Sequence, residues 1–257
     1  MRAAFFDLDK TIIAKPSVVA LSGPLRARGF INKRVVARAI WGQLLFLSFG
    51  ADDNKMEKIR RDMLKISAGW PANDVRQIVD DTIHDVIEPL IFDEALELID
   101  FHRSNGDEVW IVSSSPEEIV EPFAALVGAT GAIASRARVD EENCYTGELE
   151  FFCQGANKAV AMRELADERG IDLSASSAYS DSETDVPMFE AVGHPYAVNP
   201  DRELRAIAHA RGWPTLVFAK PVRPGTRQRP RTPFIVGLVA LAAVAVVRRR
   251  RSASPSA

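Results

Sequence analysis

The sequence is poor in cysteine and has no apolar segment near its start, and both shortages exclude classes of protein. Its 257 residues include two cysteines, Cys144 and Cys153. Two are too few for the disulfide framework of a small secreted domain, and we leave open whether they interact. Charged residues interrupt the first ten positions, MRAAFFDLDK, so no signal-peptide core can be drawn there. We therefore expect the folded part of the chain in the cytoplasm.

Long hydrophobic runs are also missing, except for one near the end. Residues 234–247, FIVGLVALAAVAVV, have no charged side chain and are followed by four arginines. As a helix they would span about 21 Å, less than the ~30 Å hydrocarbon core of a bilayer, although flanking arginines can bridge such a deficit. We expect a transmembrane or membrane-associated helix there, with a linker at 221–233 and a basic tail at 248–257. A partner-bound segment is the alternative.

Charge of the two signs is unevenly distributed. The net charge is −3, but the last 38 residues contain nine of the 32 basic residues and none of the 35 acidic ones. An acidic body argues against a nucleic-acid-binding surface, so we expect no nucleic-acid partner. The basic tail by itself favours an anionic partner such as a lipid surface or RNA.

Short apolar stretches alternate with helical patterns along most of the chain. Strands separated by helices predict an α/β fold with a parallel sheet, whose functional sites lie at the carboxyl ends of the strands. The expected strands are 3–7, 108–114, 132–136, 176–181, 196–199 and 215–219, and the expected helices between them include 116–127, 158–170 and 201–212.

Residues 15–90 interrupt this alternation. Apolar residues there recur with helical spacing at 31–48, 55–67 and 74–88, and no strand pattern is present. We expect a helical insertion over the carboxyl end of the first strand.

The stretch FFDLDKT places two carboxylates, Asp7 and Asp9, at the end of the first strand. Alternate residues of a strand point to the same face, so the two charges repel unless the chain bends or a cation lies between them. A solvated acidic turn is the alternative.

Three later segments carry polar groups at comparable positions. WIVSSS ends a strand on Ser113, and we expect Ser115 to cap the next helix with Glu118 completing a capping box, an arrangement that suits a phosphate oxygen. Lys158 opens a helix, where the helix dipole disfavours a cation unless an anion compensates it. Further acids follow another strand in AYSDSETD, and they would complete an oxygen-rich set that suits Mg²⁺ or would simply cap a helix.

The order of these four motifs over residues 3–219 resembles the haloacid dehalogenase superfamily, in its phosphoserine-phosphatase-like branch. The resemblance implies a Rossmann-like parallel sheet with helices on both faces, a catalytic core of residues 1–14 and 91–220, and a helical cap of residues 15–90. It also implies a Mg²⁺-dependent phosphatase acting on a small phosphorylated metabolite. Asp9, two residues after the nucleophile, favours hydrolysis over the retention of a phospho-enzyme seen in pumps of the superfamily.

The resemblance assigns a role to each motif residue. Asp7 would be the nucleophile and Asp9 the general acid and base, with Lys158 as a further catalytic group. Mg²⁺ would be held by Asp7, Asp9 through its carbonyl, and Asp181. The phosphate would be held by Thr11, Ser113 and Ser114, while Asp185 would orient Lys158 or the water shell of the metal.

The substrate is less well indicated. Phosphoserine phosphatases carry a cap glutamate that binds the substrate amine, but IIAKPSVVA after the first motif contains no acid. Arg60 is a candidate for binding a substrate carboxylate. A lipid-related phosphoester remains an alternative substrate, and a membrane-tethered regulatory protein with a vestigial site remains an alternative function.

Overall fold

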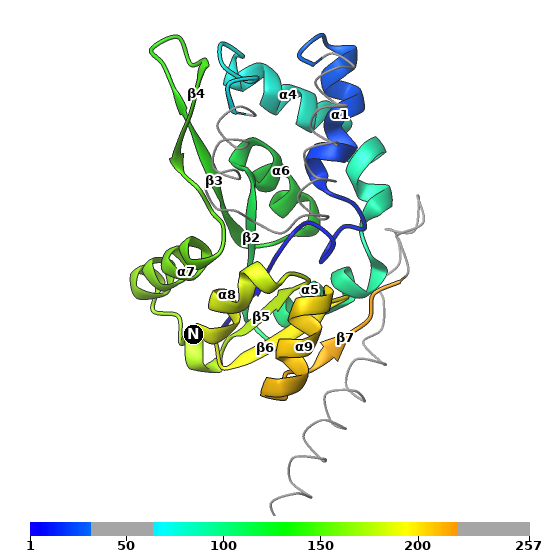
Figure 1. The fold of residues 1–257 in the computed structure, drawn as a ribbon, viewed down its shortest axis with the longest axis vertical. Helices are drawn as coiled ribbons and strands as arrows, with labels where there is room; N and C mark the ends of the chain where they lie inside the picture. The colour runs from blue at the N-terminus through cyan, green and yellow to red at the C-terminus, as the bar shows by residue number, and fades with distance from the viewer. Residues whose placement is uncertain (32–63, 220–257) are drawn as a thin grey trace, which may run out of the picture.

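The computed structural model describes residues 1–31 and 64–219, and Figure 1 shows a central sheet surrounded by helices. The seven strands have the order β4-β3-β2-β1-β5-β6-β7, and all neighbours are parallel except β3 and β4. The strands are β1 Ala3–Phe6, β2 Glu108–Pro116, β3 Gly131–Val139, β4 Tyr145–Phe151, β5 Ser177–Ser180, β6 His194–Val198 and β7 Thr215–Leu216.

The first strand lies in the middle of the sheet and is buried on both faces. Its four residues are all at most 1% exposed, and they alternate between two hydrophobic clusters. Ala4 and Phe6 belong to one cluster, while Ala3 and Phe5 belong to the other. A strand without a solvent-facing side explains why AAFF reads as a continuous apolar run.

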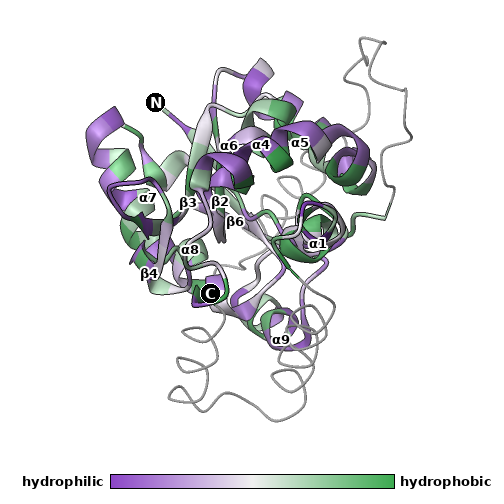
Figure 2. Ribbon diagram, turned by 90° about the horizontal axis from the view of Figure 1, so that it is seen from above, coloured by the Kyte–Doolittle hydropathy of each residue, from purple (hydrophilic) through white to green (hydrophobic). Residues whose placement is uncertain are grey.

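Each cluster is completed by the helices that cover one face of the sheet. Helices α5 (Asp93–Ser104) and α6 (Glu117–Val127) supply apolar side chains to the cluster of Phe6. Helices α7 (Ala156–Arg169), α8 (Val186–Glu190) and α9 (Arg202–Arg211) supply those of Phe5. Figure 2 shows that these helices carry both hydrophilic and hydrophobic residues. The predicted α/β fold with helices on both faces is confirmed.

The segment expected to form a cap contributes helices only, within the part that the structure describes. Helix α1 (Ser17–Ala27) and helix α4 (Ala72–Thr82) are joined by an ion pair between Arg28 and Asp81, at 2.8 Å. The pattern at 74–88 continues past α4 as a π-helical turn (Ile83–Ile87) and a 3-10 turn (Glu88–Leu90). The expected helix at 31–48 and most of the one at 55–67 lie outside the described residues, so the boundaries 15–90 stay a prediction.

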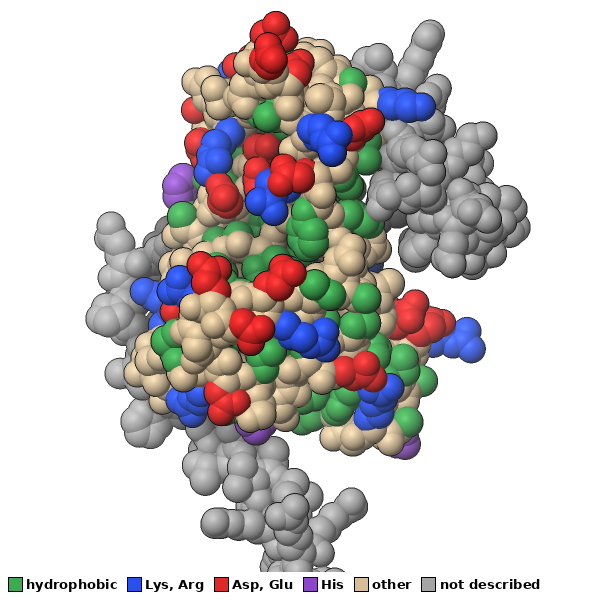
Figure 3. All heavy atoms as spheres, turned by 90° about the vertical axis from the view of Figure 1, so that its left-hand side faces the viewer, with side chains coloured by type: hydrophobic (Ala, Val, Ile, Leu, Met, Phe, Trp, Pro, Cys, Tyr) green, Lys and Arg blue, Asp and Glu red, His purple; other side chains and the backbone are tan. Residues whose placement is uncertain are grey.

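The β3–β4 hairpin extends from the sheet edge toward this helical part. A β-bridge joins Pro71 to Cys144, and the amide of Tyr145 donates to the carbonyl of Trp70 at 2.9 Å. Acidic and basic side chains lie side by side on this face of the molecule (Figure 3), and two ion pairs link the strands of the hairpin. Both cysteines are free thiols.

The expected membrane segment cannot be compared with the fold. Residues 221–257, with the linker, the apolar run at 234–247 and the basic tail, lie outside the described residues. Among residues 1–31 and 64–219, no helix has the length and apolar character needed to cross a bilayer.

Candidate active site

The first motif forms a tight loop directly after β1. The amides of Ile12 and Ile13 both donate to the carbonyl of Leu8, and the side chains of all three residues are fully buried. Lys10 takes the left-handed backbone conformation with φ 62°, which residues other than glycine rarely adopt. The buried apolar residues therefore anchor the loop while its polar residues gather at the carboxyl end of the sheet.

Lys158 binds the first carboxylate of this loop. Its amine donates to Oδ1 of Asp7 at 2.6 Å and to Oδ2 of Asp185 at 2.7 Å. All three side chains are buried, and they come from the segments after β1 and β5 and from the first turn of α7. A cation at the start of a helix needs a nearby anion, and these two carboxylates provide it for Lys158.

Among the residues that the structure describes, two buried oxygens at this edge have no hydrogen-bond partner. Oδ2 of Asp185 also accepts a hydrogen bond from the hydroxyl of Ser180, at 2.6 Å, but its Oδ1 is buried without a partner. The hydroxyl of Thr11 is likewise fully buried and unpaired. An unsatisfied buried polar group destabilises the fold, so both oxygens fit a site completed by a phosphate, a cation or water.

The buried carboxylates outnumber the buried cation. Burial raises the pKa of Asp7 to about 8, with repulsion from Asp185 and Asp181 adding to the effect of burial and Lys158 opposing it. Burial also raises the pKa of Asp181 to about 6, although Lys10 favours its ionised form. Burial alone would lower the pKa of Lys158, but the two carboxylates raise it above its usual value. A further cation at this edge would favour the ionised forms of Asp7 and Asp181.

The donor set is compatible with Mg²⁺. Asp181 follows β5 and Asp7 follows the adjacent β1, so both carboxylates lie at the same edge of the sheet. Within residues 1–31 and 64–219, no group of three or more His, Cys, Asp or Glu side chains is gathered closely enough to hold a metal ion by itself. The expected set uses two side chains and one main-chain carbonyl, and Mg²⁺ usually keeps several waters.

The second carboxylate of the loop, Asp9, lies in a separate cluster of hydroxyl groups. The main-chain N–H of Ser17 donates to its Oδ1 at 2.7 Å, and the hydroxyl of Ser115 donates to its Oδ2 at 3.3 Å. The two serine hydroxyls are 2.9 Å apart. Burial raises the pKa of Asp9, and the hydrogen bonds from Ser17 and Ser115 oppose this shift.

The predicted role of Ser115 as a helix cap is wrong. Strand β2 continues to Pro116 and α6 begins at Glu117, with no side-chain hydrogen bond at the cap. The hydroxyl of Ser115 is directed to Asp9 instead. Oε2 of Glu118 does not complete a capping box, and it is buried without a partner among residues 1–31 and 64–219. The stronger acceptor, a buried carboxylate from a distant segment, determines where the serine hydroxyl points.

The other predicted phosphate ligands lie on β2. Ser113 is buried, and its hydroxyl accepts a hydrogen bond from the amide of Ser115 at 3.1 Å. The side chain of Ser114 is exposed, and its carbonyl accepts from the hydroxyl of Ser135 at 2.8 Å. Both residues follow Val112 on the strand beside β1, at the edge that carries Asp7.

Sequence reasoning missed two residues that contact the site. Ser180 directly precedes Asp181, and Ser17 is the first residue of α1. Serines are common at both kinds of position, and neither had a sequence signal beyond its proximity to a motif. Arg60, the substrate-binding candidate, lies outside the described residues.

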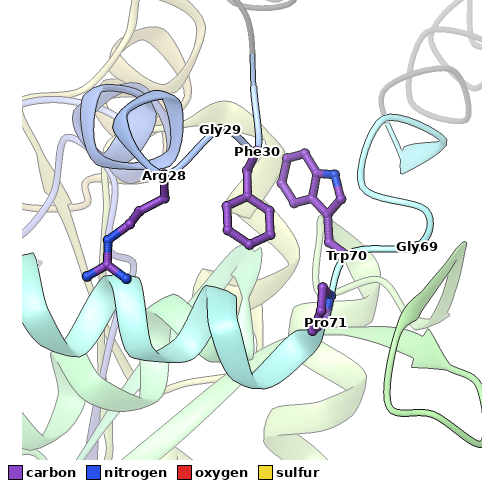
Figure 4. Close-up of a pocket in the computed structure, with 6 residues that line it drawn as sticks. All are labelled: Arg28, Gly29, Phe30, Gly69, Trp70 and Pro71. Atoms are coloured by element: carbon purple, nitrogen blue, oxygen red, sulfur yellow. The ribbon is translucent and has the colours of Figure 1, made fainter.

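One further cavity, of about 220 Å³, is lined by Arg28, Gly29, Phe30, Gly69, Trp70 and Pro71. Figure 4 shows the rings of Phe30 and Trp70 side by side, while Arg28 points toward α4. None of the motif residues lines this cavity.

Comparison with known proteins identifies the family of the chain. Residues 4–190 match the model of the family described as haloacid dehalogenase-like hydrolase. The chain is 49% identical over 244 residues to "Probable phosphatase Rv3661" of Mycobacterium tuberculosis, covering 95% of this chain and 84% of the relative. It is 32% identical over 252 residues to "Phosphoserine phosphatase SerB1" of the same organism, covering 97% and 81%.

Among solved structures, a protein of unknown function from Bordetella pertussis superposes with a TM-score of 0.72 at 28% identity, over 84% of this chain and 97% of that one. The family match covers well over half of the chain, and both relatives are named phosphatases. The chain therefore belongs to the haloacid dehalogenase-like hydrolases, as a phosphatase of their phosphoserine-phosphatase-like branch.

Proposed function

We propose that the protein is a Mg²⁺-dependent phosphomonoesterase that acts on a small phosphorylated metabolite through an aspartyl-phosphate on Asp7. The observation that supports this most is the Lys158 amine, which joins Asp7 to Asp185 beside buried oxygens that have no partner in the described part of the protein. A buried cation next to a carboxylate nucleophile would offset the repulsion between that carboxylate and an anionic ester.

The reaction would proceed in two displacements. An oxygen of Asp7 attacks phosphorus while the bond to the ester oxygen breaks, and Asp9 gives a proton to the departing alcohol. Asp9 then takes a proton from water, whose oxygen attacks phosphorus and releases inorganic phosphate and the Asp7 carboxylate. Asp9 suits both steps because burial raises its pKa, so that it can carry the proton between them.

The remaining residues would bind the phosphate and the metal ion and would orient Lys158. Thr11, Ser113 and Ser114 would donate to phosphate oxygens, and Asp185 would hold Lys158 in place. Asp7, the carbonyl of Asp9 and Asp181 would hold Mg²⁺, which when bound supplies charge stabilisation for the transferring phosphoryl group.

Removal of the nucleophile tests the mechanism. Asp7→Asn has nearly the same shape but no nucleophilic carboxylate, so we expect it to fold and to lose at least a thousandfold in kcat/KM on p-nitrophenyl phosphate. EDTA should abolish the activity of the wild type and Mg²⁺ should restore it. Activity of Asp7→Asn above a tenth of the wild-type rate, or activity indifferent to EDTA, would refute the mechanism.

The substrate requires a separate measurement. Two relatives are named "Phosphoserine phosphatase SerB1" and "Histidinol-phosphatase", so phosphoserine and histidinol phosphate belong in a panel with glycerol phosphate and a lipid-derived phosphoester. We propose that free phosphoserine is not preferred, because no acid occupies residues 12–20. A phosphoserine kcat/KM of about 10⁴ M⁻¹s⁻¹ or more, well above every other ester, would contradict this.

A further inference from the structure

Both oxygens of Asp9 are held by serines from two different parts of the chain. Ser17 begins helix α1, and its main-chain N–H donates to Oδ1. Ser115 belongs to β2, and its hydroxyl donates to Oδ2. The hydroxyls of the two serines also bond to each other, and the serines are 1% and 4% exposed. The three residues thus form a closed, largely buried cluster beside the buried Asp7.

The direction of each hydrogen bond in this cluster follows from the number of protons available. A serine hydroxyl has one proton to donate and can accept through its lone pairs. When Asp9 is ionised, Ser115 donates its one proton to Oδ2, so Ser17 is the hydroxyl that is free to donate to Ser115. In that state the donors run from Ser17 through Ser115 to Oδ2 of Asp9, while the Ser17 N–H binds Oδ1.

We propose that Ser17 and Ser115 are positioning residues that fix the carboxylate of Asp9 for proton transfer to the leaving group. The inference depends on the proposed function, since it assigns to Asp9 the proton donated in the first displacement. Rotation of the Asp9 side chain would break two hydrogen bonds and leave buried donors unpaired, which is unfavourable. Catalysis depends steeply on such placement, because an error of about 1 Å can lower a rate by about a hundredfold.

The cluster also connects the acid to the first helix of the expected cap. Pro16 at the N-cap of α1 makes no side-chain hydrogen bond, so the carboxylate of Asp9 takes the place of a capping group for the Ser17 N–H. Asp9 is consequently held on both sides only when α1 and β2 occupy the positions seen here.

The test compares esters whose leaving groups need protonation to different extents. p-Nitrophenolate leaves without a proton, whereas an alkoxide such as that of ethyl phosphate requires one. We expect Ser115→Ala to lower kcat/KM for ethyl phosphate by ten- to a hundredfold and to change kcat/KM for p-nitrophenyl phosphate by less than about threefold. Ser115→Thr, which keeps the hydroxyl, should restore at least a third of the wild-type value on ethyl phosphate.

Ser17→Ala and Ser22→Ala complete the series. Ser17→Ala keeps the N–H but removes the hydroxyl, so a smaller selective loss on ethyl phosphate is expected. Ser22 lies on the same helix, and its hydroxyl donates only to the carbonyl of Val19. Ser22→Ala should therefore behave as the wild type on both esters.

Three outcomes would overturn the proposal. Equal losses on the two esters would indicate a purely structural role for the serines, as would a failure of Ser115→Thr to restore the rate. Wild-type values in both alanine variants at Ser17 and Ser115 would show that they do not position Asp9. In these cases wild-type phosphatase activity would still support the proposed function, whereas a wild type inactive on both esters would refute the two together.

Discussion

The stability of the metal-free protein should fall as the pH rises from 6.5 to 8. Burial raises the pKa of Asp7 to about 8 from an ordinary value of 3.8, so the folded chain holds this proton more tightly than the unfolded chain. A carboxyl whose pKa is raised by folding contributes its full stability when the pH is below its pKa in the unfolded chain. This contribution is lost as the pH rises to its pKa in the folded chain. One proton released on unfolding corresponds to about 1.4 kcal/mol per pH unit, or about 2 kcal/mol over this interval.

The Asp7→Asn variant separates the contribution of Asp7 from those of other groups, among which Asp9 also has a pKa raised by burial. Asp181, whose pKa is raised to about 6, has mostly ionised before pH 6.5. Burial lowers the pKa of His102 from 6.5, so the contribution of His102 has the opposite sign and stability is gained as the pH rises. The thiol of Cys153 does not titrate here, because burial raises its pKa to about 12.

Urea unfolding at several pH values in EDTA measures the slope directly. Asp7→Asn, which cannot titrate, should show a much flatter profile. Mg²⁺ should raise the stability of the wild type most at pH 8, because a bound cation favours the ionised carboxylate. A metal-free wild type whose stability is constant or rises over this interval would refute the reasoning, as would an equal slope in Asp7→Asn.

Three further substitutions should each lower the free energy of unfolding. Lys158→Met leaves two buried carboxylates without their cation and should lower the free energy of unfolding by about 3–5 kcal/mol at pH 8 in EDTA, and by less at pH 5, where Asp7 is protonated. Tyr179→Phe removes the hydroxyl that lies 2.8 Å from Nε2 of His102 and should lower the free energy of unfolding by about 1–3 kcal/mol. A loss below about 0.5 kcal/mol would show that this hydrogen bond does not stabilise the fold. Gly155→Ala places a side chain at φ 56° and ψ −126° before α7 and should cost about 1–3 kcal/mol by urea unfolding, an expectation that full wild-type stability would contradict.

The parts of the fold with a regular pattern were predictable from the sequence. The strand at 108–114 and the helix at 116–127 were found within a residue or two, because apolar alternation and helical spacing are local properties. The helical pattern at 74–88 was recognised, but its change from α-helix to a π-helical turn after Thr82 was not, because the 3.6-residue pattern does not distinguish the two.

The site was predictable as far as its motifs, and less so in its contacts. Lys158 needed an anion on electrostatic grounds, and the structure pairs it with Asp7 and Asp185, which are 151 and 27 residues away. The hydrogen bonds of the Ser17 N–H and the Ser115 hydroxyl with Asp9 were not predicted, because they depend on the crossing of three segments. Local rules made Ser115 a helix cap, and a tertiary contact overrode them.

The central place of β1 has a consequence for how the chain acquires its structure during synthesis. Strand β1 precedes both of its partners in the chain: it pairs with β2, which begins at Glu108, and with β5, which begins at Ser177. Until β5 has been made, Phe5 and Phe6 have no complete core to enter, so the nascent chain presents an apolar strand with an unpaired edge. Sequence-distant pairing of this kind slows folding, and a ribosome stalled before β5 would hold a chain that neither buries its first strand nor resists aggregation.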